Sequence, residues 1–230
     1  MSAGRPGRLE TIGFAVAFAL AGVLLSVYVV AGEGIYARLA DPAGAVIRVE
    51  GKPKAVDRGT LVELHRDTLH YLLGAGDRLP DAPGTRTPLF DPSERGHMAD
   101  VRAVFEGMRL VVAAAHIGLV WRVASAARRG TLHLARLARR GATIAAALVA
   151  VVAIAAAVAF EPLFLAFHLV FFPQGNFLFD PATSNLLALY PESYWYGVTL
   201  LLGALFVTSA GLVALVGTVV AHRSSIHSKT

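Results

Sequence analysis

The sequence predicts an all-α membrane protein with four transmembrane helices and, between the first two of them, a small extracytoplasmic cap that could be α+β. Three observations support this fold class. The chain has 230 residues, of which 55% are hydrophobic and only 16% charged, whereas a soluble domain usually carries about a quarter charged residues. The missing charge is concentrated in a few long apolar runs. Successive segments between those runs are alternately rich and poor in unbalanced Lys and Arg, which is the pattern of loops on the two sides of a bilayer.

The first two apolar runs differ in strength. Ile12 to Ala31 holds 20 residues without a charge, which is enough to cross a hydrocarbon core of about 30 Å. The apolar part of a cleaved signal peptide has roughly 7–15 residues, so we expect a retained helix instead. The second run, Val104 to Val120, is the weakest span because Glu106, Arg109 and His116 interrupt it.

The last two runs are Ala142 to Phe167, which contains Glu161 and Pro162, and Tyr196 to Ala221. The runs predict the following division of the chain: N-terminus and first transmembrane helix 1–31, extracytoplasmic cap 32–102, second transmembrane helix 103–122, basic cytoplasmic loop 123–141, third transmembrane helix 142–168, extracytoplasmic loop 169–195, fourth transmembrane helix 196–222 and cytoplasmic tail 223–230.

The distribution of positive charge predicts the orientation. Segment 169–195 has no Lys or Arg, and segment 32–102 balances ten basic against eleven acidic residues. The unbalanced positive residues are Arg5, Arg8, Arg122, Arg128, Arg129, Arg136, Arg139, Arg140, Arg223 and Lys229. The positive-inside rule therefore places both termini in the cytoplasm of a plasma or inner membrane. An anionic inner leaflet accounts for the net charge of +5 without a nucleic-acid partner.

Segment 32–102 is too long to be a simple connection. Residues 45–49 (AVIRV) predict a strand and 51–53 (GKP) a turn. Residues 60–73 have helical spacing of leucines, and 74–92 are rich in Gly, Pro and Asp and are expected to be irregular. Asp91, Pro92 and Glu94 form a capping-box-like helix start, which continues into the second span.

Two of the eight histidines are singled out by their height in the membrane. His97 lies 25 residues before Arg122, and His168 lies 28 residues after Arg140, or roughly 38 and 42 Å of helix. Both should therefore return to one level at the outer surface, His97 on exposed first turns. Asp100 shares the helix face of His97 and could orient its ring. Two histidines that merely bridge helices would fit the spacing as well.

The other histidines have plainer interpretations. His65 and His70 are expected on a surface helix, and His133, His222 and His227 in cytoplasmic segments. Arg109 and Glu161 lie at membrane depth and should pair or line a polar cleft descending from the outer face, because isolated charges there are unfavourable. Glu106 and Arg109 could instead pair locally. The chain has no cysteine. A His pair with Asp could bind Zn²⁺, but a third protein ligand is not evident, so no metal or cofactor is expected.

Three segments resemble a known family. Residues 94–102 (ERGHMADVR), 168–181 (HLVFFPQGNFLFDP) and 190–192 (YPE) look like the lipoprotein intramolecular transacylase (Lit) family of four-span bacterial membrane proteins, and the likeness extends over the four-span layout. Phe177 stands where the family pattern has Trp. The resemblance implies that the substrate is a diacylglyceryl lipoprotein whose sn-2 acyl chain moves to its N-terminal cysteine amine. It also implies that His97 and His168 are the catalytic residues.

The chemistry of ester aminolysis suggests further roles. A base must take a proton from the amine, an acid must protonate the leaving alkoxide, and a donor must stabilise the oxyanion. Asn176, Arg109 or a protonated histidine are candidate donors, with Asp180 and Glu161 as supporting residues. There is no Gly-x-Ser-x-Gly elbow. A non-enzymatic protein whose cap binds a lipid or envelope partner, and a His-dependent metal hydrolase, remain alternatives.

Overall fold

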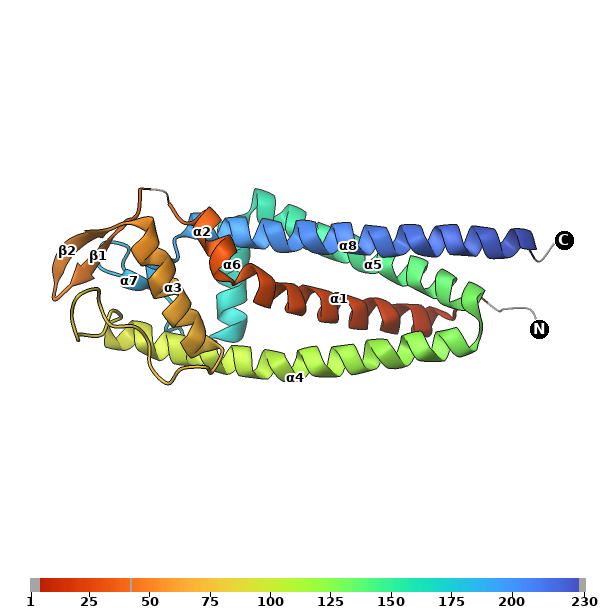
Figure 1. Cartoon of the computed structure of the whole chain (residues 1–230), viewed down its shortest axis with the longest axis horizontal. Coiled ribbons are helices and arrows are strands. Elements are labelled where there is room, and N and C mark those ends of the chain that lie inside the picture. The colour runs from red at the N-terminus through yellow and green to blue at the C-terminus, as the bar shows by residue number, and fades with distance from the viewer. Residues whose placement is uncertain (1–4, 42, 228–230) are drawn as a thin grey trace. The chain divides into compact units, whose positions relative to one another are not determined.

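The computed structural model describes residues 5–41 and 43–227 and is mostly helical (Figure 1). In chain order its elements are α1 (Arg8–Val30), α2 (Glu33–Leu39), β1 (Ala45–Val49), β2 (Lys52–Val56), α3 (Arg58–Leu72), α4 (Pro92–Arg128), α5 (Thr131–Val158), α6 (Phe160–Phe171), α7 (Asn185–Leu189) and α8 (Glu192–His227). The chain forms two compact units: the first unit is Met1–Val27, Arg109–Ala155 and Leu201–Thr230, and the second unit is Tyr28–Met108 and Ala156–Leu200.

The first unit consists of four helices that run alongside one another (Figure 1). Its main core joins α1, α5 and α8 through small residues and one ring, and the buried members are Ala15, Ala142, Ala145, Phe206 and Ala210. Small residues let the helix backbones approach closely, which is how helices associate in lipid. Gly217 shows this directly, because a Cβ there would lie 2.7 Å from the carbonyl oxygen of Ala135.

Four helices of the described chain are long and apolar enough to cross a membrane, and they lie at Arg8–Val30, Pro92–Arg128, Thr131–Val158 and Glu192–Ser224. The predicted four-span fold class is therefore confirmed. Pro92–Arg128 is the least hydrophobic of them, as the charges within that run predict. Where the bilayer begins and ends along each helix remains a prediction.

The third span is not the single continuous helix that was predicted over 142–168. α5 ends at Val158 and α6 begins at Phe160, with Ala159 between them in a non-helical conformation (φ −145°, ψ 57°). Pro162 explains the break, because a proline ring collides with the carbonyl four residues earlier, which here belongs to Val158. Within the first turn of the new helix the same proline is tolerated. The two compact units also divide at this point of the chain.

The basic segment 123–141 is helical rather than a loop. α4 continues to Arg128 and α5 begins at Thr131, so only Arg129 and Gly130 connect them. Glu10 of α1 holds this connection and the start of α5, since it accepts hydrogen bonds from Arg129 (3.1 Å) and from Nε2 of His133 (3.0 Å). Lys229, the last basic residue of the predicted tail, lies outside the described residues.

The predicted strand lies in the second unit at Ala45–Val49, after α2, and it pairs antiparallel with Lys52–Val56. The turn was predicted at 51–53 but lies at Glu50 and Gly51, which connect the paired residues Val49 and Lys52. Both turn residues have positive φ (50° and 77°). Two consecutive residues of this kind match the twist of a hairpin. The second strand was missed because Lys52-Pro53-Lys54 is a weak strand sequence.

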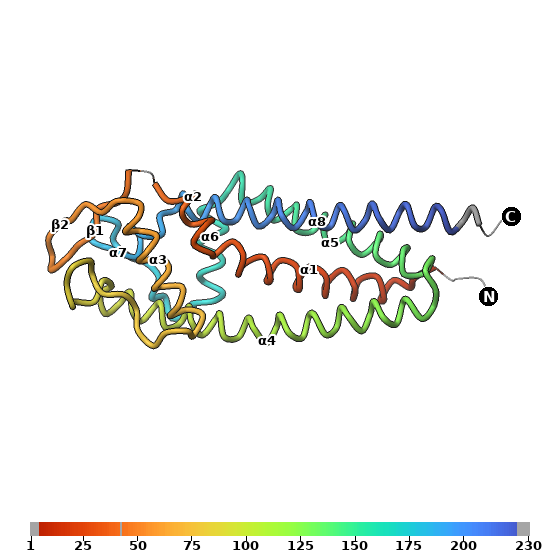
Figure 2. The backbone as a smooth tube through the Cα atoms, in the orientation of Figure 1, coloured from red at the N-terminus to blue at the C-terminus, as the bar shows by residue number. Residues whose placement is uncertain are grey.

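The rest of the cap follows the prediction more closely. The helix expected over 60–73 is α3, whose N-cap Asp57 accepts a hydrogen bond from the backbone N–H of Thr60 at 2.7 Å. That bond holds the pKa of the Asp57 carboxyl below its ordinary value. Residues 73–91 form an irregular connection between α3 and α4, as expected, and contain one isolated bridge between Asp81 and Pro88 (Figure 2). The short helices α2 and α7 were not predicted.

A cluster of aromatic rings forms the core of the second unit, and His65 lies inside it. The expectation of a surface position for His65 is wrong, since the residue is buried. Its ring stacks on Tyr36 with centroids 4.0 Å apart, its Nε2 donates to the carbonyl of Ala31 (2.8 Å), and its Nδ1 accepts from the hydroxyl of Tyr190 (3.0 Å). Tyr36 in turn donates to the carbonyl of Leu189 at 2.8 Å. The cluster thus ties α3 to both α2 and α7.

The burial of His65 predicts that the folded protein is less stable in acid. Burial lowers the pKa of His65, although the bond to Ala31 and the charge of Glu33 oppose this. Protonation of His65 is therefore less favourable in the folded protein than in the unfolded chain, where the histidine takes up a proton below pH about 6.5. The contribution of neutral His65 to the free energy of unfolding is fully present above that pH and is lost as the pH falls below it. We expect the thermal midpoint to drop between pH 7.5 and 5. The drop should be smaller in His65→Gln than in His70→Gln, which changes an exposed residue of the same helix; equal drops would contradict the prediction.

Candidate functional site

The site begins at the N-terminus of α4, where the predicted capping box is confirmed. Asp91 Oδ1 accepts from the backbone N–H groups of Ser93 (2.8 Å) and Glu94 (2.9 Å), and Glu94 Oε2 accepts from the backbone N–H of Asp91 (3.0 Å). Burial alone would raise the pKa of Asp91, but these hydrogen bonds keep it below its ordinary value. The helix start is therefore fixed three residues before Glu94, which also fixes the position of His97 one turn later.

The two histidines predicted to share one level lie face to face. The ring centroids of His97 on α4 and His168 on α6 are 6.1 Å apart, and the ring planes differ by 23°. His97 is buried rather than exposed as expected for the first turns of the helix, and His168 is partly exposed. The two residues are 71 positions apart in the sequence. The two rings lie close together as predicted, although the prediction assumed a continuous helix up to His168, and α5 and α6 are separate helices.

Aromatic side chains enclose the pair. Phe172 contacts both rings, with centroid distances of 4.7 Å to His97 and 5.5 Å to His168. Phe179 lies 5.6 Å from His97, while Phe164 and Phe177 lie 4.2 and 5.1 Å from His168. All of these rings come from α6 or from the loop that follows it. A wall of this kind limits water around the histidines, which strengthens any polar interaction made there.

Asp100 holds the loop beside the histidines. Its Oδ2 accepts hydrogen bonds from Gln174 Nε2 (2.7 Å) and from Asn176 Nδ2 (2.6 Å). The sequence suggested that Asp100 would orient His97 directly, but these two amides take its hydrogen bonds. Asp100 therefore connects α4 to the loop that carries the enclosing phenylalanines. Gln174 was not singled out from the sequence, and its partnership with Asp100 is what identifies it.

Glu94 holds the far end of the same loop. It is 1% exposed, and its Oε1 accepts from the hydroxyl of Ser184 (2.6 Å) and from the backbone N–H of Leu186 (2.8 Å). Glu94, His97 and Asp100 are spaced three residues apart, so they lie along one side of α4. The two acids bind the two ends of the loop, and the histidine lies between them.

Hydrogen bonds define which nitrogen of His168 is available. Its Nδ1 is 2.8 Å from the carbonyl oxygen of Phe164. A carbonyl only accepts, so in the neutral ring Nδ1 carries the hydrogen and Nε2 keeps its lone pair. In the described part of the chain, the buried atoms His97 Nδ1 and Asn176 Oδ1 form no hydrogen bond within 3.5 Å, although the two side chains interact with each other. Buried polar atoms are normally bonded, so these two are suited to meet polar groups of a ligand.

Glu161 and Asp180, which were also predicted as site residues, make no contact with the pair. Glu161 is exposed in the first turn of α6, and Asp180 accepts from the backbone N–H of Ala182 (2.9 Å) in an exposed turn. Arg109 belongs to the first unit, so its relation to the histidines stays a prediction. Glu106 is bonded to Arg102 at 3.2 Å. Across the described residues, no three His, Asp or Glu side chains are grouped to hold a metal ion.

Asn185 is a further buried residue that the sequence did not reveal. Its side chain accepts from the backbone N–H of Arg48 (2.6 Å) and donates to the carbonyls of Arg48 (2.8 Å) and Leu89 (2.6 Å). It therefore ties α7 to β1 and to the segment before α4. The only local signal was the Ser184-Asn185 pair, which is typical of a helix start, and Ser184 is indeed the N-cap of α7.

Comparison with known proteins gives one family and one fold. The family described as lipoprotein intramolecular transacylase Lit matches residues 14–195. The chain is similar to a structure of the membrane-integral lipoprotein intramolecular transacylase Lit from Bacillus cereus, with 16% identity and a TM-score of 0.71 over 95% of this chain and 97% of that one. Two variants of the Bacillus cereus protein also match, each at 15% identity and a TM-score of 0.66. The match to the variant with a histidine replaced by arginine covers 96% of this chain and 94% of that one. The match to the variant with a histidine replaced by alanine covers 95% of each chain. No curated protein sequence matches.

Proposed function

The chain belongs to the lipoprotein intramolecular transacylase (Lit) family, and from this premise we propose that it moves the sn-2 acyl chain of a diacylglyceryl lipoprotein onto the amine of that lipoprotein's N-terminal cysteine. Membership makes the protein a multi-pass membrane acyltransferase, so a purely non-enzymatic role is no longer favoured. The observation that supports a histidine mechanism is the enclosed pair His97 and His168, with ring centroids 6.1 Å apart.

His168 is the proposed general base. An amine attacks an ester only in its neutral form, and an α-amino group has a pKa of about 7.7–8.0. A histidine, whose ordinary pKa is about 6.5, is matched to receive the amine proton. The bond from Nδ1 to the carbonyl of Phe164 leaves Nε2 as the basic nitrogen. It also fixes the ring's rotation, so the base does not need to be ordered when substrate binds.

The proposed reaction needs no group beyond the protein and the lipoprotein. The cysteine nitrogen forms a bond to the sn-2 carbonyl carbon while its proton passes to His168. The tetrahedral intermediate then breaks its bond to the glyceryl oxygen, which takes up a proton and becomes the hydroxyl of the lyso-form product. Amine and ester belong to one molecule, so holding them in a reactive pose can contribute on the order of 7–11 kcal/mol.

His97 is the proposed acid or oxyanion partner. The centroid of its ring lies 6.1 Å from that of His168, and its buried Nδ1 forms no hydrogen bond within 3.5 Å among the described residues. Asn176 is proposed to take part from the loop, where Asp100 fixes the direction of its amide. Glu161 is exposed in the first turn of α6 and is given no role in the reaction, and Arg109 belongs to the first unit.

We place the site on the extracytoplasmic side and both termini in the cytoplasm. Segments 5–8 and 122–140 carry an excess of Arg, and segment 169–195 has none, which the positive-inside rule assigns to opposite sides of the membrane. A lipoprotein's acyl chains lie in the bilayer and its N-terminal cysteine lies at the surface, so a site at the outer end of the spans meets both groups.

Co-expression with a diacylglyceryl lipoprotein tests the proposed function. Mass spectrometry of the lipoprotein's N-terminal peptide should show one acyl chain as an amide on the cysteine and a glycerol that keeps a single ester. The same lipoprotein from cells without the chain is the control. An unchanged, fully diacylated glycerol in both cultures would contradict the proposal.

Asp100 is proposed as a positioning residue, and its removal should slow the reaction. Asp100→Ala frees the amides of Gln174 and Asn176, which allows the enclosing loop to shift. A displacement of about 1 Å lowers the rate roughly a hundredfold, so we expect a ten- to hundredfold fall in kcat. Asp100→Asn keeps an oxygen acceptor and should recover most of that loss. Asp180→Ala, which removes an exposed acid of the same loop, is the control. A parental rate for Asp100→Ala, or equal rates for the two Asp100 variants, would contradict this role.

A further inference from the structure

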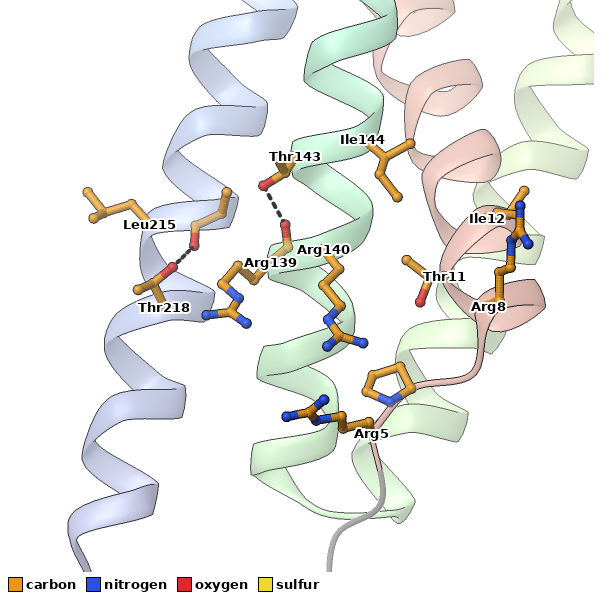
Figure 3. Close-up of a pocket in the computed structure, with 12 residues that line it drawn as sticks. Arg5, Arg8, Thr11, Ile12, Arg139, Arg140, Thr143, Ile144, Leu215 and Thr218 are labelled. Atoms are coloured by element: carbon orange, nitrogen blue, oxygen red, sulfur yellow. Dashed lines mark hydrogen bonds between the residues drawn. The ribbon is translucent and has the colours of Figure 1, made fainter.

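The first unit contains a cavity that the transacylase site does not use. It has a volume of about 1080 Å³ and lies between α1, α5 and α8 (Figure 3). Its wall includes four arginines: Arg5 and Arg8 beside the start of α1, and Arg139 and Arg140 on α5. In Figure 3 the guanidinium groups of Arg139 and Arg140 extend toward the end of the cavity where Arg5 lies.

These positive charges are not neutralised by the protein. No acidic residue lines the cavity. In the described chain none of the four arginines forms an ion pair, and Glu10 on α1 is bonded to Arg129 (3.1 Å) and His133 (3.0 Å). In Figure 3 the guanidinium groups of Arg5, Arg139 and Arg140 lie toward one end of the cavity, and that of Arg8 lies beside Ile12. Like charges that lie close together repel each other and attract an anion. An arginine presents a planar fork of N–H donors that matches a phosphate.

The other groups on the wall indicate that the anion has an apolar part. Ile12, Ile144 and Leu215 line the cavity and have 43%, 39% and 59% of their surface exposed. The hydroxyls of Thr143 and Thr218 donate to carbonyls of their own helices, drawn as dashed lines in Figure 3, so the arginines supply the donors. Charge beside exposed aliphatic side chains suits an amphiphile better than a free anion.

We propose that this cavity binds the phosphate headgroup of an anionic phospholipid, with its acyl chains lying along Ile12, Ile144 and Leu215. Its three helices are membrane-spanning candidates, and the cavity lies at their arginine-rich end. Basic pockets between transmembrane helices on the cytoplasmic side suit anionic headgroups. The site is separate from the histidine pair, which belongs to the second unit, and it does not depend on the acyl transfer.

Lipid retention by the purified full-length protein tests this site. Native mass spectrometry should show more bound dioleoyl-phosphatidylglycerol than dioleoyl-phosphatidylcholine from mixed micelles. Replacing both α5 arginines (Arg139→Gln with Arg140→Gln) should lower the retained phosphatidylglycerol at least tenfold. The matched control, Arg38→Gln with Arg58→Gln, makes the same charge change on exposed residues of the second unit and should retain the lipid.

A second pair of variants and a displacement measurement complete the test. If the α5 variant does not fold, Arg5→Gln with Arg8→Gln removes the other half of the charge and should also lower retention. Glycerol 3-phosphate at millimolar concentration should not displace the lipid; displacement would mean that a free phosphate is the ligand and would overturn the proposal. Equal retention by the α5 variant and the control, or equal binding of the two lipids, would overturn it as well.

Discussion

His168→Ala is expected to lower the rate of acyl transfer at least about a hundredfold, because general base catalysis contributes roughly 10²- to 10⁴-fold. His97→Ala should have an effect of similar size if that ring protonates the alkoxide or stabilises the oxyanion. Initial rates on a synthetic diacylglyceryl lipopeptide, followed by mass spectrometry of the amide product, give the comparison. Both rings lie among phenylalanines, so a loss of activity must be separated from a loss of folding.

Two controls separate these effects. His116 lies elsewhere on α4, where its Nδ1 donates to the carbonyl of Val112 at 2.8 Å, and His116→Ala should keep most of the activity. The thermal midpoints of all three variants should stay near the parental value. The double variant His97→Ala with His168→Ala should be little slower than either single variant, because residues that act as a unit are not additive. Normal rates from both single variants would refute the histidine mechanism.

Glu94→Ala is expected to be the most destabilising single change in the second unit. The carboxylate is buried and accepts from Asp91, Ser184 and Leu186, so its removal leaves two backbone N–H groups and a hydroxyl without an acceptor. Unsatisfied buried groups of this kind each destabilise by about 1–3 kcal/mol, so the total should reach about 3 kcal/mol or more. A chain of this size then loses roughly 6–12 °C in thermal midpoint.

The exposed acid Glu106 provides the matched control for Glu94. It lies on the same helix and pairs with Arg102 at 3.2 Å, and an exposed pair contributes only about 0–1 kcal/mol. Glu106→Ala should therefore unfold within a few degrees of the parent. Glu94→Gln, which retains one oxygen acceptor, should fall between the two. A Glu94→Ala midpoint that matches Glu106→Ala would show that the loop is held mainly by other contacts.

The parts of the fold that the sequence predicts are those set by local chemistry. Four apolar runs must bury their backbone polar groups in helices, which is why the spans are visible without a structure. The capping box at Asp91 involves residues three apart, so its hydrogen bonds can be anticipated from the letters alone. The proximity of His97 and His168 was expected from the rise of two continuous helices, but the break at Ala159 means that helix length alone does not place His168.

The parts that were missed depend on contacts between distant residues. His65 has the spacing of a surface helix, but Tyr36 and Tyr190 come from two other segments to bury it. Asn185 binds Arg48 across 137 positions, and no local pattern encodes that partnership. Asp100 illustrates the same limit within the site, since its helix position predicted a bond to His97 while the loop supplies Gln174 and Asn176 instead.

The break in the third span could have been predicted from the sequence. Pro162 lies inside the third apolar run, and its effect on the carbonyl of Val158 follows from proline geometry alone. The apolar composition on both sides of it favoured one continuous span. The break matters for the site, because it makes α6 a separate helix that carries His168 and the phenylalanines around it.

A crossover experiment tests most directly whether the protein moves the sn-2 chain within one lipoprotein. Two synthetic diacylglyceryl lipopeptides are mixed with the purified protein, one unlabelled and one carrying a heavy peptide and a heavy sn-2 acyl chain. Transfer within one molecule should leave every heavy peptide with a heavy chain on its cysteine amine and every light peptide with a light one, and both should keep their sn-1 esters. Amide products that combine a heavy chain with a light peptide, or sn-1 chains on the amine, would contradict it.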